Sequence, residues 1–214
     1  MGSSRLPGKV LMAIGPKLLL DHVVERARFR PDVPVVVATG SEIRDDAIEA
    51  RCRLLGVDCF RGDEQDVLGR YVACASSRRF DHVIRLTADN PFTDMDELHR
   101  LLAFHLEGKY DYSESVSALP VGAGAEIFSA ACLHASEENG KERHHREHVN
   151  EYVLENSAIF RIGRPAVPAA KARSDIHLTI DTADDLRKAC FVIQNAATDP
   201  VTLEEAIELC SRFA

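Results

Sequence analysis

Val33-Pro34-Val35-Val36-Val37-Ala38-Thr39 is the stretch that decides the fold class. Its three consecutive valines are typical of a strand covered on both faces, as in a parallel sheet between two layers of helices. A helical pattern precedes the stretch from Pro16 to Phe29, and a second one follows it from Ile43 to Leu55. The chain around this strand therefore alternates between strand and helix.

The alternation continues through the first half of the chain. Strand patterns lie at 57–60 and 82–86, and helical patterns lie at 67–77 and 94–106. Strands that alternate with helices favour crossover connections and a parallel sheet with helices on both faces. We therefore expect an α/β fold, a three-layer sandwich with a mainly parallel central sheet.

The second half is less regular. Its last two helices are preceded by the capping residues Thr182 and Thr202. The other predicted elements are strands at 110–116, 125–128, 158–162 and 177–180, a short helix capped by Ser129 and a helix at 146–155. Because no linker, repeat or low-complexity tract separates the halves, we expect a single domain over residues 1–214.

Composition and charge exclude several classes of protein. The 214 residues are 45% hydrophobic and 28% charged, which is typical of a globular domain. A net charge of −8 argues against general nucleic-acid binding, and no apolar run is long enough to span a membrane. The six cysteines are scattered without a Cys-x-x-Cys pair, so we expect reduced thiols and a cytoplasmic location.

A loop of small residues with two cations opens the chain. It runs from Gly2 to Lys9, and its backbone N–H groups are free to approach and cradle an anion. Arg5 and Lys9 add the full positive charges that phosphate oxygens favour. The loop therefore predicts a phosphate site, with a flexible basic terminus as the alternative.

Two acidic residues follow strand-like runs. Asp89 lies in the loop after the strand at 82–86, and Asp181 follows the strand at 177–180. Ligands of open α/β sheets bind at the carboxyl ends of strands, where two carboxylates can hold one Mg²⁺. The alternatives are a turn residue for Asp89 and a helix N-terminal acid for Asp181.

Six segments, in a fixed order, resemble those of the nucleotide-sugar cytidylyltransferases. The resemblance is strongest to the spore-coat polysaccharide biosynthesis protein F group, with the acylneuraminate and 3-deoxy-manno-octulosonate cytidylyltransferases as relatives. The segments cover nearly the whole chain: GSSRLPGK (2–9), RGDEQDVLGRY (61–71), RLTADNP (85–91), PVG (120–122) with Glu126, EHV (147–149) and DTADDL (181–186).

The resemblance implies a GT-A-like fold and transfer of CMP from CTP to a sugar or sugar acid, with release of pyrophosphate, for surface polysaccharide or glycoconjugate biosynthesis. It implies catalytic roles for Arg5, Lys9, Asp89 and Asp181, with both aspartates as ligands of Mg²⁺. It also implies a homodimer. The residues implied to bind the nucleotide are Ser3, Ser4, Arg5, Leu6, Pro7, Gly8, Lys9, Arg85 and Thr87, and those implied to bind the sugar are Glu126 and His148.

The chain departs from the family's pattern in two places. Members carry a strand before the basic loop, ending in a Gln-Ala-Arg-like segment, whereas this loop begins at residue 2. We therefore expect the first strand to be missing, the loop to be loosely held, and activity to be weak or absent. Gly124 and Ala125 stand where the group often has an acidic residue, which puts sugar contacts there in question.

Three alternatives stay open. One is a truncated, non-catalytic relative, and another is a GT-A glycosyltransferase with Asp89 on the metal of a nucleotide sugar. The Asp89-Asn90-Pro91 segment has one acid where such enzymes usually have an Asp-x-Asp motif. The third is a zinc hydrolase, because His144, Glu147 and His148 match the His-x-x-Glu-His signature. On a helix, the two histidines would share a face.

An apolar pattern follows His148. Val149, Tyr152, Val153 and Leu154 would form one side of the helix predicted at 146–155. This side is a candidate surface for the implied homodimer, with ordinary core packing as the alternative.

Overall fold

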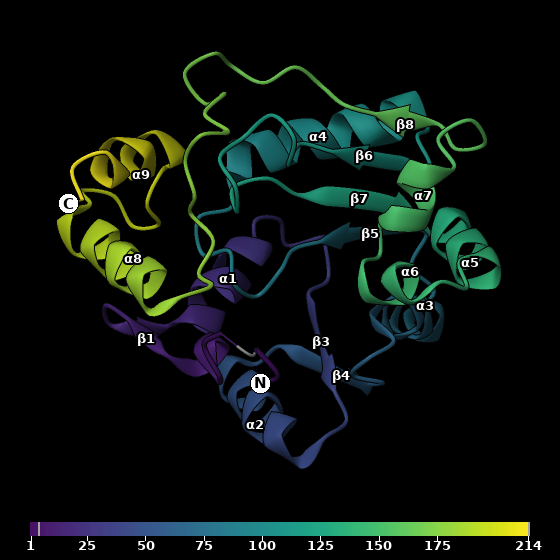
Figure 1. Cartoon of the computed structure of the whole chain (residues 1–214), viewed down its shortest axis with the longest axis horizontal. Coiled ribbons are helices and arrows are strands. Elements are labelled where there is room, and N and C mark those ends of the chain that lie inside the picture. The colour runs from purple at the N-terminus through teal and green to yellow at the C-terminus, as the bar shows by residue number, and fades with distance from the viewer. Residues whose placement is uncertain (4, 214) are drawn as a thin grey trace.

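The valine-rich stretch forms strand β3 (Val36–Gly40), and the elements after it alternate between helix and strand (Figure 1). The structure, a computed structural model, describes residues 1–3 and 5–213. The elements that follow β3 are the 3-10 helix η2 (Ile43–Asp45), α2 (Asp46–Leu55), β4 (Asp58–Gly62), α3 (Val67–Arg78), β5 (His82–Arg85) and α4 (Met95–Gly108). The predicted α/β class is confirmed.

The strands that follow the first helix form two separate sheets among the described residues. In the smaller sheet, β3 and β4 are parallel. The larger sheet has the order β5-β7-β6-β8, in which β7 (Glu126–Ser129) is antiparallel to both β5 and β6 (Tyr112–Glu114). The last strand, β8 (Ile162–Gly163), is parallel to β6.

The larger sheet is therefore mixed, which the alternation alone did not predict. The crossover through α4 gives β5 and β6 the same direction, as expected for a strand–helix–strand unit. The connection from β6 to β7 contains no helix in the structure, and such connections join antiparallel neighbours. As a result, β7 lies between two strands that are parallel to each other.

The two sheets are not hydrogen-bonded to each other. Among residues 1–3 and 5–213, β3 pairs only with β4, and β5 pairs only with β7. Each of these strands therefore has one edge whose backbone N–H and C=O groups lack a partner strand. In the described part of the chain, no strand joins the sheets.

The N-terminal segment forms a turn and a short hairpin before the first helix. Its elements are η1 (Lys9–Leu11), β1 (Ala13–Ile14), β2 (Lys17–Leu18) and α1 (Leu19–Ala27). The tight turn of the hairpin contains Gly15, which has φ +61° and comes close to the side chain of Ile193. The helix predicted from Pro16 therefore begins later, because residues 17–18 pair with β1.

The second half departs further from the predicted elements. Its helices are α5 (Ala130–Asn139), α6 (Arg143–Glu147), α7 (Glu151–Glu155), α8 (Ala183–Asn195) and α9 (Leu203–Cys210). The helix predicted at 146–155 is instead divided between α6 and α7. The strand predicted at 177–180 is reduced to one bridge, between Val121 and His177. The predicted caps are present, because Thr182 Oγ1 and Thr202 Oγ1 accept hydrogen bonds from the backbones of Asp185 and Glu205.

Helices cover both faces of the larger sheet, as the three-layer prediction requires (Figure 1). On one face, Leu98 and Leu101 of α4 pack with Ile127 of β7. On the other face, Phe128 packs with Leu68 of α3 and Leu133 of α5. A further core cluster joins the N-terminal hairpin to the C-terminal helices α8 and α9. Among the described residues, no helix combines the length and apolar character needed to cross a bilayer.

Candidate functional site

The side chain of Lys9 lies where three oxygen atoms converge. Its Nζ is 2.8 Å from Asp89 Oδ2 and 3.0 Å from Asp181 Oδ1. It also donates a hydrogen bond of 2.7 Å to the carbonyl oxygen of Ile180. These three acceptors match the three protons of an ammonium group. Lys9 is only 9% exposed, so the structure holds the side chain that we expected to be loosely held.

Three chain segments, distant in sequence, bring this cluster together. Lys9 opens η1 directly after Gly8, whose φ of 74° turns the backbone. Asp89 lies in the loop after β5, and Asp181 lies just before α8. A hydrogen bond of 2.9 Å from the N–H of Ile180 to the carbonyl of Asp89 joins the two acidic loops. The site thus lies beyond the carboxyl end of β5, where ligands of α/β sheets bind.

Arg5 is the second cation of the cluster. Its Nη2 lies 3.0 Å from Asp181 Oδ1, but 65% of its side chain is exposed. An exposed ion pair of this kind contributes little to stability, so Arg5 can move toward a ligand at low cost. Together, Arg5 and Lys9 balance the charges of the two aspartates.

The other predicted nucleotide-binding residues come from the basic loop, the end of β5 and the loop after β5. Ser3 Oγ accepts a hydrogen bond of 3.2 Å from the N–H of Leu6, which also packs against the core. Pro7 is exposed, and Thr87 Oγ1 accepts a hydrogen bond of 2.6 Å from the side chain of Asn90. The predicted role of Ser4 falls on a residue outside the described ranges.

A cavity of about 230 Å³ lies beside the basic loop. Its wall includes Gly2 from the loop, Arg70 from α3 and Ala88 from the loop after β5. Other wall residues come from β3 and from the helices η1, α1, η2 and α2. Pockets for whole ligands are usually about 300–1,000 Å³, so this one suits a part of a larger molecule.

Arg85 and Glu126 form a partly buried ion pair. They lie directly opposite each other in the β5–β7 register. The second carboxylate oxygen of Glu126 accepts a hydrogen bond of 2.6 Å from Tyr112. Burial and the adjacent carboxylate raise the pKa of Tyr112, so the phenol remains a donor. The sequence predicts that Arg85 binds the nucleotide and that Glu126 binds the sugar. In the structure the two side chains form an ion pair with each other.

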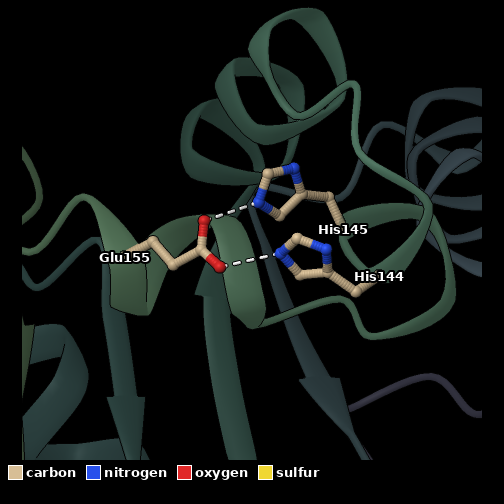
Figure 2. A group of neighbouring side chains, drawn as sticks. All are labelled: His144, His145 and Glu155. Atoms are coloured by element: carbon tan, nitrogen blue, oxygen red, sulfur yellow. Dashed lines mark hydrogen bonds and ion pairs between the residues drawn. The ribbon is translucent and has the colours of Figure 1, made fainter.

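The ligand set of the zinc signature is not assembled. Helix α6 ends at Glu147, and the backbone at the exposed His148 is extended. Among the described residues, the group of three side chains that could hold a metal is instead His144, His145 and Glu155 (Figure 2).

Figure 2 shows that this group is a hydrogen-bonded clamp between α6 and α7. Each imidazole Nε2, of His144 and of His145, lies 2.7 Å from a different carboxylate oxygen of Glu155. The Nδ1 of His145 accepts a bond of 3.3 Å from the N–H of Glu142, which places the ring proton on Nε2. A histidine nitrogen binds a metal through a lone pair, and the proton on Nε2 of His145 takes up that position. The clamp therefore favours hydrogen bonding over metal binding.

The apolar pattern after His148 packs into the core. Val149 and Val153 are fully buried and belong to the same cluster as Phe128. Leu154 is partly buried against that cluster. The structure therefore supports the core alternative for these three residues. The half-buried Tyr152 packs edge-on against His145 and Phe160.

Sequence reasoning missed two sets of contacts made by aspartates, of which only Asp45 lines the cavity. Asp66 caps α3 by accepting a hydrogen bond of 2.8 Å from the N–H of Gly69, and it also pairs with Arg146 of α6. Asp45, which is 1% exposed, holds the amino group of Met1 at 2.8 Å. An acidic residue just before a helix signals the cap, but no local pattern reveals its partner in α6.

Comparisons with known proteins fit this arrangement. A family model described as Cytidylyltransferase matches residues 1–211. The spore coat polysaccharide biosynthesis protein SpsF of Bacillus subtilis is 35% identical, with 99% of this chain and 91% of that protein covered. A structure of a cytidylyltransferase from Leptospira borgpetersenii is 29% identical, with a TM-score of 0.91, and 99% of this chain and 90% of that chain are covered.

A more distant structure shares the fold. It is that of a CMP:2-keto-3-deoxy-manno-octonic acid synthetase complexed with CTP, with a TM-score of 0.66 at 19% identity. The similarity covers 90% of this chain and 94% of that chain. Because the family model spans the loops that carry Lys9, Asp89 and Asp181, the chain belongs to the cytidylyltransferase family and is a nucleotidyltransferase.

Proposed function

We propose that this enzyme transfers CMP from CTP to a sugar or sugar acid, with release of pyrophosphate, in the synthesis of a surface polysaccharide or glycoconjugate. The observation that carries the proposal is the convergence of Lys9, Asp89 and Asp181 beside the basic loop. The CMP:2-keto-3-deoxy-manno-octonic acid synthetase complexed with CTP supports the choice of nucleotide and of a sugar acid as acceptor, and the name of SpsF supports a role in polysaccharide biosynthesis.

The donor atoms at the site fit a divalent cation. The carboxylates of Asp89 and Asp181 reach the same point, which already holds a positive charge. Carboxylate oxygens are the ligands that Mg²⁺ prefers, and Mg²⁺ usually keeps waters and phosphate oxygens as its other ligands. We infer that these two residues hold Mg²⁺, which supplies Lewis-acid polarisation of the α-phosphate when it is bound.

The basic loop then serves the triphosphate. The guanidinium of Arg5 is exposed and able to pair with phosphate oxygens. Lys9 supplies a point charge close to the reacting group. These groups stabilise the negative charge that builds up on pyrophosphate as it leaves. The cavity beside Gly2 and Ala88 receives another part of the nucleotide.

For the sugar acceptor, we propose one residue that contacts it directly and one that positions other side chains. His148 is exposed and available to the sugar. Glu126 is committed to Arg85 and Tyr112, so it acts on the sugar site by positioning these side chains.

We further propose a cytoplasmic homodimer, which sedimentation velocity at micromolar concentrations tests directly. A monomer throughout that range would reject the dimer.

The reaction is tested by pyrophosphate release. Each of the four nucleoside triphosphates is offered with Mg²⁺ and a panel of sugar acids and neutral sugars. We expect release with CTP and with at least one sugar of the panel. A preference for another triphosphate, or no release with CTP and any acceptor, would contradict the proposal.

A further inference from the structure

Lys9 occupies the point where a divalent cation would bind. Its Nζ is within 3.0 Å of one oxygen from each of Asp89 and Asp181, and the carbonyl oxygen of Ile180 completes its set of acceptors. We propose that Lys9 is an exchangeable counter-ion: it holds the two carboxylates together in the free enzyme, and it moves to the triphosphate when the nucleotide arrives with its metal. This inference rests on the proposed function.

Electrostatics explains why the free enzyme needs a cation at this point. Two carboxylates that share a site repel each other, and an adjacent cation offsets that repulsion. The ammonium of Lys9 supplies that compensation from a side chain with 10% exposure. Arg5 assists at Asp181 from the solvent side, where 65% of its side chain is exposed. The cluster is therefore charge-balanced before any ligand binds.

The same contacts oppose binding of a metal alone. Mg²⁺ binds oxygen at about 2.0–2.1 Å, so it cannot share these carboxylate oxygens with the ammonium without strong repulsion. Lys9 would have to leave, and within the cluster its displaced charge would find no new anion. The triphosphate provides that anion, because its oxygens can accept both Lys9 and Arg5.

Metal and nucleotide must therefore bind with positive coupling. Each ligand relieves a cost imposed on the other: the metal replaces Lys9 between the carboxylates, and the triphosphate receives Lys9. Coupling of this kind is reciprocal, and its usual size is about 5–150-fold in affinity. We expect a value in this range for the free enzyme, and a smaller one when Lys9 cannot carry a charge.

The first test measures Mn²⁺ binding by the loss of its free electron paramagnetic resonance signal, with and without CTP. For the wild-type protein, we expect weak binding of Mn²⁺ alone and on the order of tenfold tighter binding with CTP. Lys9→Met should bind Mn²⁺ alone on the order of tenfold more tightly than the wild type, and CTP should add little. Lys141→Met, the same change at an exposed lysine, should behave as the wild type.

The second test uses the unaltered protein, so it does not depend on folding of a variant. The ammonium groups of Lys9 and Lys171 are both buried, and Lys171 pairs with Asp94 at 2.7 Å, away from the proposed site. Both should give protected signals in lysine ¹⁵N spectra. We expect Mg²⁺ with CTP to shift the Lys9 signal, Mg²⁺ alone to leave it in place, and the Lys171 signal to stay unchanged as an internal reference.

The outcomes separate the two proposals. If calorimetry shows that Mg²⁺ and CTP bind while the Lys9 signal stays unchanged, the exchange is wrong and the proposed function stands. If folded Lys9→Met binds Mn²⁺ alone no better than the wild type, the exchange is again wrong. If neither CTP nor the metal binds under any condition, both the exchange and the proposed function fail.

Discussion

At the scale of single residues, a change from aspartate to asparagine removes a negative charge and keeps nearly the same side-chain shape. Asp89→Asn keeps an oxygen that can accept from Lys9 but removes one of the two charges proposed to hold Mg²⁺. We expect kcat/KM for pyrophosphate release to fall by about 10²–10³. The Tm should shift by less than about 4 °C, as expected for a loss of up to about 1 kcal/mol.

The matched control is Asp96→Asn. Asp96 is exposed in the first turn of α4, so the same change of type and charge occurs away from the cluster. It should leave kcat/KM within about twofold of the wild type. An Asp89→Asn protein that keeps half of the wild-type activity would show that Asp89 is not a metal ligand.

A second residue-scale prediction concerns pH. Burial, and then the charge of His82, lower the pKa of His105 from 6.5 to about 4. The unfolded chain binds a proton at His105 below its ordinary pKa, while the folded chain resists it. His105 therefore makes the free energy of unfolding depend on pH. Its contribution is fully present above pH 6.5 and is lost as the pH falls through 4.

Urea unfolding at pH 7 and pH 4.5 measures this effect. Between these values, the wild type should lose about 2–3 kcal/mol more unfolding free energy than His105→Gln loses. His99→Gln, an exposed histidine on the same helix, should keep the wild-type pH dependence. Equal losses in the wild type and His105→Gln would reject the prediction.

The site residues differ in how far sequence could place them. Lys9 closes the basic loop and Asp89 lies in the loop after β5, so the pattern of loops and strands predicts a site at the carboxyl end of β5. Asp181 joins this site although the strand predicted before it is reduced to one bridge, between Val121 and His177. Arg85 and Glu126 lie 41 residues apart in the sequence, and their contact depends on the register between β5 and β7. No local pattern encodes that register, so the sequence alone does not predict the contact between these two side chains.

At the scale of elements, the free edges of β3 and β5 predict the effect of an added strand. We expect an apolar, β-branched segment fused before Met1 to pair with these edges and to fix the basic loop. The amino group of Met1 would give up its contact with Asp45. Because small misplacements of reacting groups cost up to about 10²-fold, kcat/KM for CTP should rise on the order of tenfold, and Tm should rise with it.

A glycine–serine segment of the same length is the control, since it has low β-propensity. It should raise neither kcat/KM nor Tm. If the chain without any extension turns over CTP as efficiently as the chain with the apolar strand, the contacts of Lys9 alone hold the loop well enough.

Element boundaries were harder to predict than element types. The helical spacing from Pro16 continues into α1, but the hairpin turn at Gly15 draws residues 17–18 into a strand. The apolar spacing at 146–155 reads as one helix, yet the packing of Val149 and Val153 is achieved by two short helices with His148 between them. In both places the local pattern predicts a helix correctly, but tertiary contacts decide where the helix begins and ends.

At the scale of the whole molecule, removal of the metal should stop the reaction without unfolding the protein. Lys9 and Arg5 already balance Asp89 and Asp181 in the free enzyme, so no uncompensated charge remains when the metal leaves. We expect EDTA to abolish pyrophosphate release and Mg²⁺ to restore it, with a change in Tm below about 2 °C. A large fall of Tm in EDTA, or activity that persists there, would contradict this expectation.

The fold class was the feature most open to sequence reasoning. The alternation from β3 to α4 depends on residues close together in the chain, and its period is visible directly. The separation into two sheets and the place of β7 between β5 and β6 depend on long-range pairing. That information lies in side-chain packing across the sheet, which a single sequence does not display.

The distance along the chain between the members of the Lys9 cluster sets the order of events during synthesis. Lys9 and Asp181 lie 172 residues apart. At a translation rate of roughly 5–20 residues per second, Lys9 leaves the peptidyl-transfer centre roughly 10–35 s before Asp181 is made. The nascent protein therefore carries its cationic loop without the second carboxylate until Asp181 is translated, and the site is completed only after that point.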